Sequence, residues 1–145
     1  MPEAAGERPL RAPAVAVLDV ESGLRRALLD RGFYVELLGI FLDDYGPAAQ
    51  DIRASLAEGR RSEALRIAHS AKGEAANISA EEVRLRAAIC EAILRDGRDA
   101  ELPAALSALE SALGRTAEAI GAYRESSGQG RGEAAGAAAG RGNAS

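Results

Sequence analysis

The sequence predicts an all-α protein, an up-down-up-down antiparallel four-helix bundle with a short extra N-terminal helix. Alanine, the strongest helix former, supplies 33 of the 145 residues. Most of the larger apolar residues are leucine and only 3% of the chain is aromatic, which favours helix packing over a β-sandwich or barrel. Five stretches carry apolar residues at helical spacing, and the segments between the last four are short, so we expect successive helices to be antiparallel.

The folded region is predicted to be a single domain at residues 14–124, with a disordered segment on each side. Residues 1–13 contain three of the five prolines and few large apolar side chains. Residues 125–145 consist mostly of Gly, Ala and Ser and contain no large apolar residue. Such segments cannot bury enough apolar surface to offset the conformational entropy that they would lose on ordering.

The first helix is expected at residues 19–30. Asp19 or Ser22 is a suitable N-cap, and Gly32 lies near the expected end. The apolar run at 14–18 is ambiguous. It is compatible with a short extended lead-in, although no nearby segment offers it a partner strand.

The second helix is expected at residues 33–58 and the third at 62–79. Gly46 and Pro47 should kink or break the second helix, because proline lacks the N–H that a helix interior requires. Ser62 is the expected cap of the third helix.

The fourth helix is expected at residues 81–96, ending at Gly97, and the fifth at 102–124. Cys90 lies on the apolar stripe of the fourth helix, which favours a buried and inert thiol. The spacing of leucines in the fifth helix alternates between three and four residues, as in helix bundles.

The only His and the only Lys of the chain, His69 and Lys72, lie three residues apart on the third helix. His69 falls on the exposed side of this helix, opposite a predicted core face formed by Ile67, Ala68, Ala71, Ala75 and Ile78. An exposed His is usually an ordinary surface residue. Here, however, Gly73 stands one turn further on, at a cost of about 1 kcal/mol relative to Ala, and the close approach of another surface would explain it.

The charge around His69 is positive. Residues 59–73 carry four basic residues against one acidic residue, whereas residues 33–58 are net negative. A positive neighbourhood around an exposed imidazole favours the transfer of an anion such as a phosphoryl group.

Composition excludes several other functions. The net charge of −4 argues against electrostatic binding of nucleic acid. One Cys and one His cannot form an internal disulfide, a Cys-based zinc site or a multi-histidine metal site, and Asp43 with Asp44 is interpreted as a solvated acidic face. No segment approaches the ~20 apolar residues of a membrane span, and no signal-peptide core is present. We therefore expect a cytoplasmic protein without a bound cofactor or metal.

The segment Ala68-His69-Ser70-Ala71-Lys72-Gly73 resembles the phospho-accepting helix of histidine phosphotransfer (HPt) domains, with its His-x-x-Lys-Gly core after Ala. The resemblance covers roughly residues 18–113. The chain departs from the family pattern in four places: Ala71 replaces a larger apolar residue, Glu74 a small one and Ser79 a frequent Gly, and no Asp follows Gly32. We expect Glu74 to influence partner choice.

The resemblance implies a phosphocarrier rather than an enzyme with its own ATP site. His69 would accept the phosphoryl group, Lys72 would pair with its oxygens and Gly73 would admit the partner. The remaining residues expected to contact a docked partner are Ser62, Arg66, Ser70, Ala76 and Asn77. The implied partners are response-regulator receiver domains, which would supply Mg²⁺, and a hybrid sensor kinase, and the carrier would be a monomer.

Two alternatives remain open from the residues alone. One is an adaptor that keeps the bundle and docks receivers or other signalling domains without carrying phosphate. The other is a plain helical scaffold or dimerisation module in which His69 has no chemical role.

Overall fold

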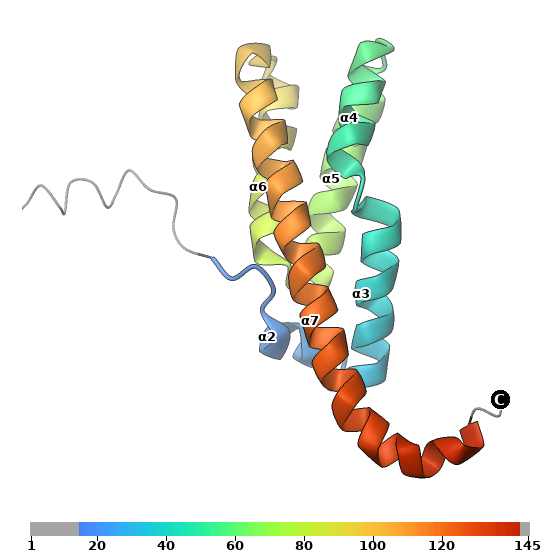
Figure 1. Cartoon of the computed structure of the whole chain (residues 1–145). Coiled ribbons are helices and arrows are strands. Elements are labelled where there is room, and N and C mark those ends of the chain that lie inside the picture. Colours follow the sequence, from blue (N-terminus) through green and yellow to red (C-terminus); the bar gives the residue numbers. More distant parts are fainter. Residues whose placement is uncertain (1–14, 143–145) are drawn as a thin grey trace, which may run out of the picture.

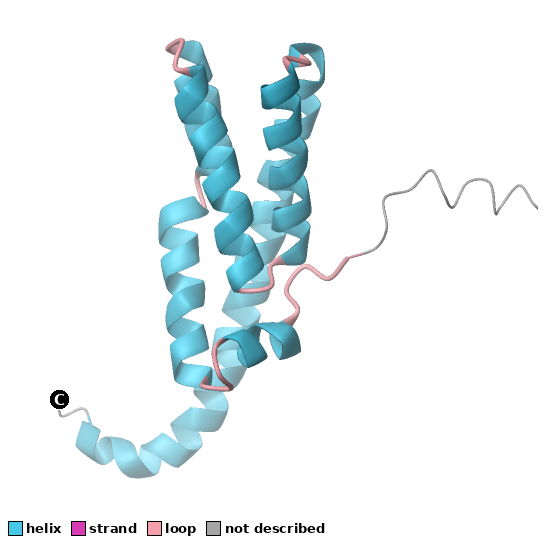
Figure 2. Ribbon diagram, turned by 180° about the vertical axis from the view of Figure 1, so that it is seen from behind, coloured by secondary structure: helices cyan, strands magenta, loops and turns pink. Residues whose placement is uncertain are grey.

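The computed structural model describes residues 15–142, with side chains described up to residue 127. This part of the chain is helical throughout and contains no strand, which confirms the all-α prediction (Figures 1 and 2). The elements in chain order are α2 (Val20–Arg26), α3 (Arg31–Tyr45), α4 (Ala48–Ala57), α5 (Arg61–Asn77), α6 (Glu81–Asp96), the short 3-10 helix η2 (Asp99–Glu101) and α7 (Leu102–Gly142). The predicted disordered segment 1–13 lies outside the described residues.

Helices α4, α5, α6 and the first half of α7 lie side by side, and α3 extends the line of α4 toward the other end (Figure 1). The chain reverses direction in the short connections 58–60 and 78–80 (Figure 2). The buried face of α5 consists of alanines at helical spacing: Ala64, Ala68, Ala71 and Ala75. Because these side chains are small, α4 and α6 can pack closely against α5, so Ala71 fits this bundle where a larger residue is usual in the family.

Helix α2 begins where predicted but ends early. The side chain of Asp19 accepts a hydrogen bond from the backbone N–H of Ser22 at 3.2 Å, as an N-cap does. The helix ends at Arg26 rather than at residue 30, because Leu28 and Leu29 adopt left-handed conformations with φ of 61° and 62°. The predicted end near Gly32 is therefore wrong: the chain turns before Asp30, which caps α3.

The break predicted at Gly46-Pro47 is confirmed, since α3 ends at Tyr45 and α4 begins at Ala48. The end of α6 at Gly97 is also confirmed, with a left-handed φ of 73°. The prediction that Ser62 caps the third helix is wrong. Arg60 occupies the N-cap of α5, and its side chain makes no capping hydrogen bond.

Helix α7 extends to Gly142, into the segment 125–145 whose predicted disorder stays a prediction. Its first half is already anchored in the bundle, so each further residue adds a helical hydrogen bond without a new nucleation step. The alanines of the tail support this continuation. No helix in residues 15–142 is both long and apolar enough to cross a membrane.

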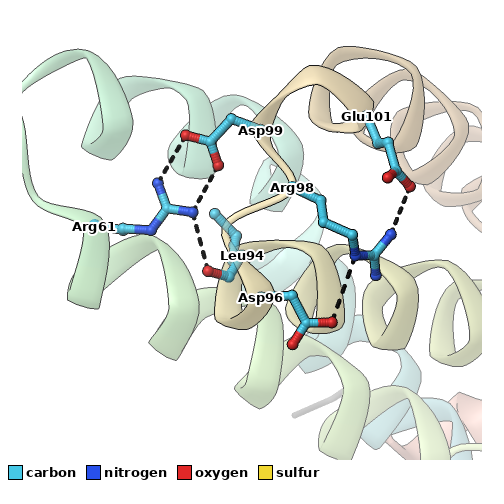
Figure 3. A network of polar contacts seen from close by, with 6 residues as sticks. All are labelled: Arg61, Leu94, Asp96, Arg98, Asp99 and Glu101. Atoms are coloured by element: carbon cyan, nitrogen blue, oxygen red, sulfur yellow. Dashed lines mark hydrogen bonds and ion pairs between the residues drawn. The ribbon is translucent and has the colours of Figure 1, made fainter.

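Polar contacts hold α5 at both ends. At its start, Arg61 binds Asp99 at 2.7 Å and the carbonyl of Leu94 at 3.0 Å, which connects α5 to the end of α6 and to η2 (Figure 3). At its end, the carbonyl of Ser79 accepts a hydrogen bond from the N–H of Asp19 at 2.9 Å. These contacts tie both ends of α5 to neighbouring elements.

Tyr34 provides a second contact at the C-terminal end of α5. Its buried hydroxyl donates a hydrogen bond to the carbonyl of Ile78 at 2.8 Å. Its ring packs edge-on against the ring of Tyr123, with 5.7 Å between the two ring centroids. A Cβ atom at position 23 would overlap the Tyr34 hydroxyl, which explains why Gly23 is glycine. Burial raises the pKa of Tyr34, and the nearby Tyr123 and Asp19 add to the effect.

We expect Tyr34→Phe to lower the free energy of unfolding by about 1 kcal/mol, because the buried carbonyl of Ile78 loses its donor. Urea denaturation of the full chain measures the change. Tyr123→Phe is the matched control, since the Tyr123 hydroxyl is buried without a hydrogen-bond partner among the described residues, and its loss should cost little. Equal losses in the two variants would contradict the assigned role of the Tyr34 hydrogen bond.

Candidate functional site

The side chain of His69 stands on the outer face of α5 and is 66% exposed, as the helical pattern predicts. Gly73 follows one turn later on the same face, and a Cβ atom built there would meet no heavy atom within 4 Å. The bundle itself therefore does not require glycine at this position. Because Gly73 has no side chain, the surface next to the imidazole is open, so a second molecule can approach the ring closely.

A buried carboxylate from the neighbouring helix holds the imidazole. Nδ1 of His69 lies 2.8 Å from Oε2 of Glu91 on α6, whose side chain is only 5% exposed. Glu91 was not among the residues predicted from the sequence. Its position in the sequence could have indicated it, because Glu91 follows Ala87 by one turn and precedes Leu94 by nearly one turn, on the apolar stripe of its helix. An acidic residue on such a stripe is unfavourable unless it has a partner.

Two permanent cations complete the cluster around Glu91. Nζ of Lys72 lies 2.7 Å from Oε1, and the guanidinium of Arg95 lies 2.7 Å from Oε2. The Glu91 carboxylate thus contacts three positively charged or proton-donating side chains, His69 and Lys72 from α5 and Arg95 from α6. This arrangement compensates a charge that would otherwise be costly to bury.

The pKa of Glu91 lies below its usual range. Burial alone raises this pKa, but hydrogen bonds from Lys72 and His69 stabilise the charged form and together outweigh burial. The carboxylate is therefore ionised at neutral pH and can only accept hydrogen bonds. A neutral His69 must then carry its proton on Nδ1, which leaves the lone pair of Nε2 free to act as a nucleophile.

The other basic residues of the segment 59–73 are engaged elsewhere. Arg60 pairs with Glu58, Arg61 with Asp99 and Arg66 with Glu63, at distances of 2.6 to 2.7 Å. The positive charge near the imidazole therefore comes from Lys72, as expected, and from Arg95, which lies outside that segment.

The residues expected to contact a partner all lie on α5. Ser62, Arg66 and Asn77 are exposed, whereas Ser70 and Ala76 are half-buried. Beside Asn77 a groove of about 590 Å³ opens between α3 and α5, lined by apolar residues such as Ile40 and by acidic residues such as Asp44 and Glu74. His69 is not among its lining residues.

Cys90 is buried and free, in agreement with its predicted place on the apolar stripe. Burial raises the pKa of its thiol to about 11, so the reactive thiolate is scarce at neutral pH. Asp43 and Asp44 are both exposed. Among the described residues, no three His, Cys, Asp or Glu side chains are placed to hold a metal ion.

We expect Glu91→Gln to lower the free energy of unfolding at neutral pH by about 2 kcal/mol, because Lys72 and Arg95 lose their shared counter-ion. The folded state lowers the pKa of Glu91, so this stabilisation is present above the carboxyl pKa of the unfolded chain and is lost as pH falls through the folded pKa. The stability difference between wild type and variant should therefore shrink in acid. Urea titrations at a series of pH values measure it.

Glu74→Gln is the control for this experiment, since it removes the same charge from the exposed side of α5. It should change stability little at any pH. A wild-type advantage over Glu91→Gln that stays constant from neutral pH into acid would show that the ionised carboxylate does not stabilise the fold.

Comparison with known proteins agrees with this site. A model of the Hpt domain family matches residues 36–122, more than half of the chain, and the matched range contains both His69 and Glu91. No curated protein and no solved structure matches the chain. With an exposed imidazole on a helical bundle and this family match, the chain belongs to the Hpt domain family, whose members serve in phosphotransfer in two-component signalling.

Proposed function

We propose that this protein is a phosphocarrier in a multistep two-component phosphorelay. His69 accepts a phosphoryl group from the phospho-aspartate of one receiver domain and passes it to another receiver. The observation that carries the proposal is the exposed imidazole whose Nδ1 is held by the buried carboxylate of Glu91, which directs reactivity to Nε2. Such a carrier takes its phosphoryl group from another protein and needs no ATP site of its own.

The transfer is an in-line displacement at phosphorus. The Nε2 lone pair of His69 forms the N–P bond while the bond between phosphorus and the aspartate oxygen breaks, and its electron pair leaves with the aspartate carboxylate. The ring becomes positive, with its proton still on Nδ1, and the negative charge of Glu91 stabilises it there. Attack by the aspartate of a second receiver reverses these changes and restores the neutral imidazole.

Lys72 neutralises charge on the phosphoryl group. Its ammonium rests on Oε1 of Glu91, is 34% exposed and sits at the end of a flexible stem three residues from His69. It can therefore turn from Glu91 toward phosphoryl oxygens on Nε2. We expect the receiver to supply Mg²⁺ from the acidic pocket around its own aspartate.

The partner docks on the exposed face of α5. Gly73 lets it approach the imidazole, and the polar residues of this face offer it contacts. Receiver domains fit this chemistry, and a hybrid sensor kinase is the further partner that the family resemblance implies. The docking contacts are expected at Ser62, Arg66, Ser70, Ala76 and Asn77.

Incubation with a phosphorylated receiver should transfer label to the wild-type protein. The label should be acid-labile and base-stable, as a phosphoramidate is, because the new bond joins phosphorus to an imidazole nitrogen. His69→Gln should take up no label, since it removes the only imidazole of the chain. Lys72→Ala should still be labelled, but more slowly.

Three outcomes decide against parts of this assignment. A wild-type protein that binds receivers but takes label from none of a panel is an adaptor. Labelling of His69→Gln at the wild-type level places the acceptor elsewhere. A full-strength rate in Lys72→Ala removes Lys72 from the mechanism.

We expect Gly73→Gln to leave the fold intact and to slow transfer on the order of 10–100-fold, because the new side chain keeps the reacting atoms apart. The variant should be at least as stable as wild type, since Gln is the better helix former. Stability is measured by urea denaturation and transfer by single-turnover labelling.

Gly114→Gln is the matched control. Gly114 is an exposed glycine within α7, and a Cβ atom there also meets nothing within 4 Å. It should gain similar stability and transfer at the wild-type rate. Wild-type transfer by Gly73→Gln would mean that partners do not approach over Gly73.

A further inference from the structure

Arg95 is a second permanent cation on the buried carboxylate of Glu91. It lies one turn after Glu91 on α6, and its guanidinium contacts Oε2 at 2.7 Å. This is the same oxygen that Nδ1 of His69 approaches at 2.8 Å. The guanidinium and the imidazole therefore share one acceptor oxygen, whose lone pairs can serve both.

The charges around Glu91 do not balance one to one. Among the described residues, every charged group in contact with this carboxylate comes from α5 or α6: Lys72 on Oε1, and Arg95 together with His69 on Oε2. Two permanent positive charges face a single negative charge. The carboxylate is therefore already fully compensated when the imidazole is neutral.

This excess of positive charge disfavours a further positive charge next to the carboxylate. A carboxylate paired with one cation would attract a second proton onto the imidazole, and an imidazolium has no lone pair with which to attack phosphorus. A carboxylate paired with two cations still accepts the Nδ1 hydrogen bond, but it attracts a further positive charge less strongly than a carboxylate paired with one. The ring can thus be oriented by Glu91 and still be a nucleophile.

We propose that Arg95 is a positioning residue, which binds Oε2 of Glu91 and so keeps His69 neutral with its proton on Nδ1. Arg95 suits this role better than Lys72, because the ammonium of Lys72 turns toward the phosphoryl group during transfer. Arg95 then remains with Glu91 and compensates its charge. The catalytic significance of the role rests on the proposed function, since a neutral ring matters only if His69 attacks phosphorus.

The test is an NMR titration of the full-length protein with ¹⁵N-labelled histidine. The chain contains a single His, so both imidazole nitrogen signals belong to His69. We expect Arg95→Gln to raise the midpoint of the imidazole titration by about half a pH unit, given that the guanidinium is partly exposed. The neutral ring should keep its proton on Nδ1, because Glu91 remains its acceptor. Arg95→Lys should return the midpoint toward wild type.

Arg84→Gln is the matched control. Arg84 lies on the same helix and pairs with Glu81 at 2.7 Å, so the variant removes an equal charge and a similar ion pair away from His69. It should titrate as wild type does. If Arg95→Gln also titrates as wild type, or at lower pH, Arg95 is only a surface ion pair and the proposal is wrong, whatever its effect on stability.

Phosphotransfer assays give the second readout. The transfer rate of Arg95→Gln at neutral pH should fall by up to about threefold, the factor that corresponds to half a pH unit, and should recover as pH is raised. A rate deficit that is the same at every pH would contradict the proposal. Failure of the wild-type protein to accept phosphate would refute the proposed function, while the NMR titration would still decide the role of Arg95.

Discussion

The buried carboxylate of Glu91 is the interaction on which the reactive face of the protein depends. A charge that is only 5% exposed is unfavourable unless neighbouring groups compensate it, and the compensating groups come from two helices. Lys72 and His69 lie on α5, and Arg95 lies on α6 with Glu91 itself. The same contacts that stabilise the charge also orient the imidazole and join the two helices at the site.

The bundle supplies the rigidity that this cluster needs. Helix α5 is held at its start by Arg61 and at its end by Tyr34, while alanines along its buried face allow α6 to pack closely. A functional group is positioned most accurately when its supporting element cannot shift. The open surface at Gly73 is the complementary feature, because it leaves the rigid imidazole accessible to a second protein.

Local signals in the sequence predicted several elements correctly. Gly97 ends α6 because only a residue that tolerates positive φ fits there, and Pro47 breaks the second helix because it lacks an N–H. Other helix ends were predicted incorrectly. Leu28 and Leu29 are good helix formers, yet they adopt left-handed conformations in the turn that leads into α3. Ser62 is a suitable cap residue, but Arg60 occupies the N-cap of α5.

The sequence by itself determined which face of α5 carries His69 and Gly73, because helical periodicity is a local property and three or four residues separate the side chains that share a face. Only the tertiary structure decided what holds the imidazole. His69 and Glu91 are 22 positions apart and meet because α5 and α6 pack against each other. Their pairing depends on how the two helices pack against each other. The periodicity within either helix carries no information about that packing. The exposed position of His69 could therefore be predicted from one helix, whereas its pairing with Glu91 required two.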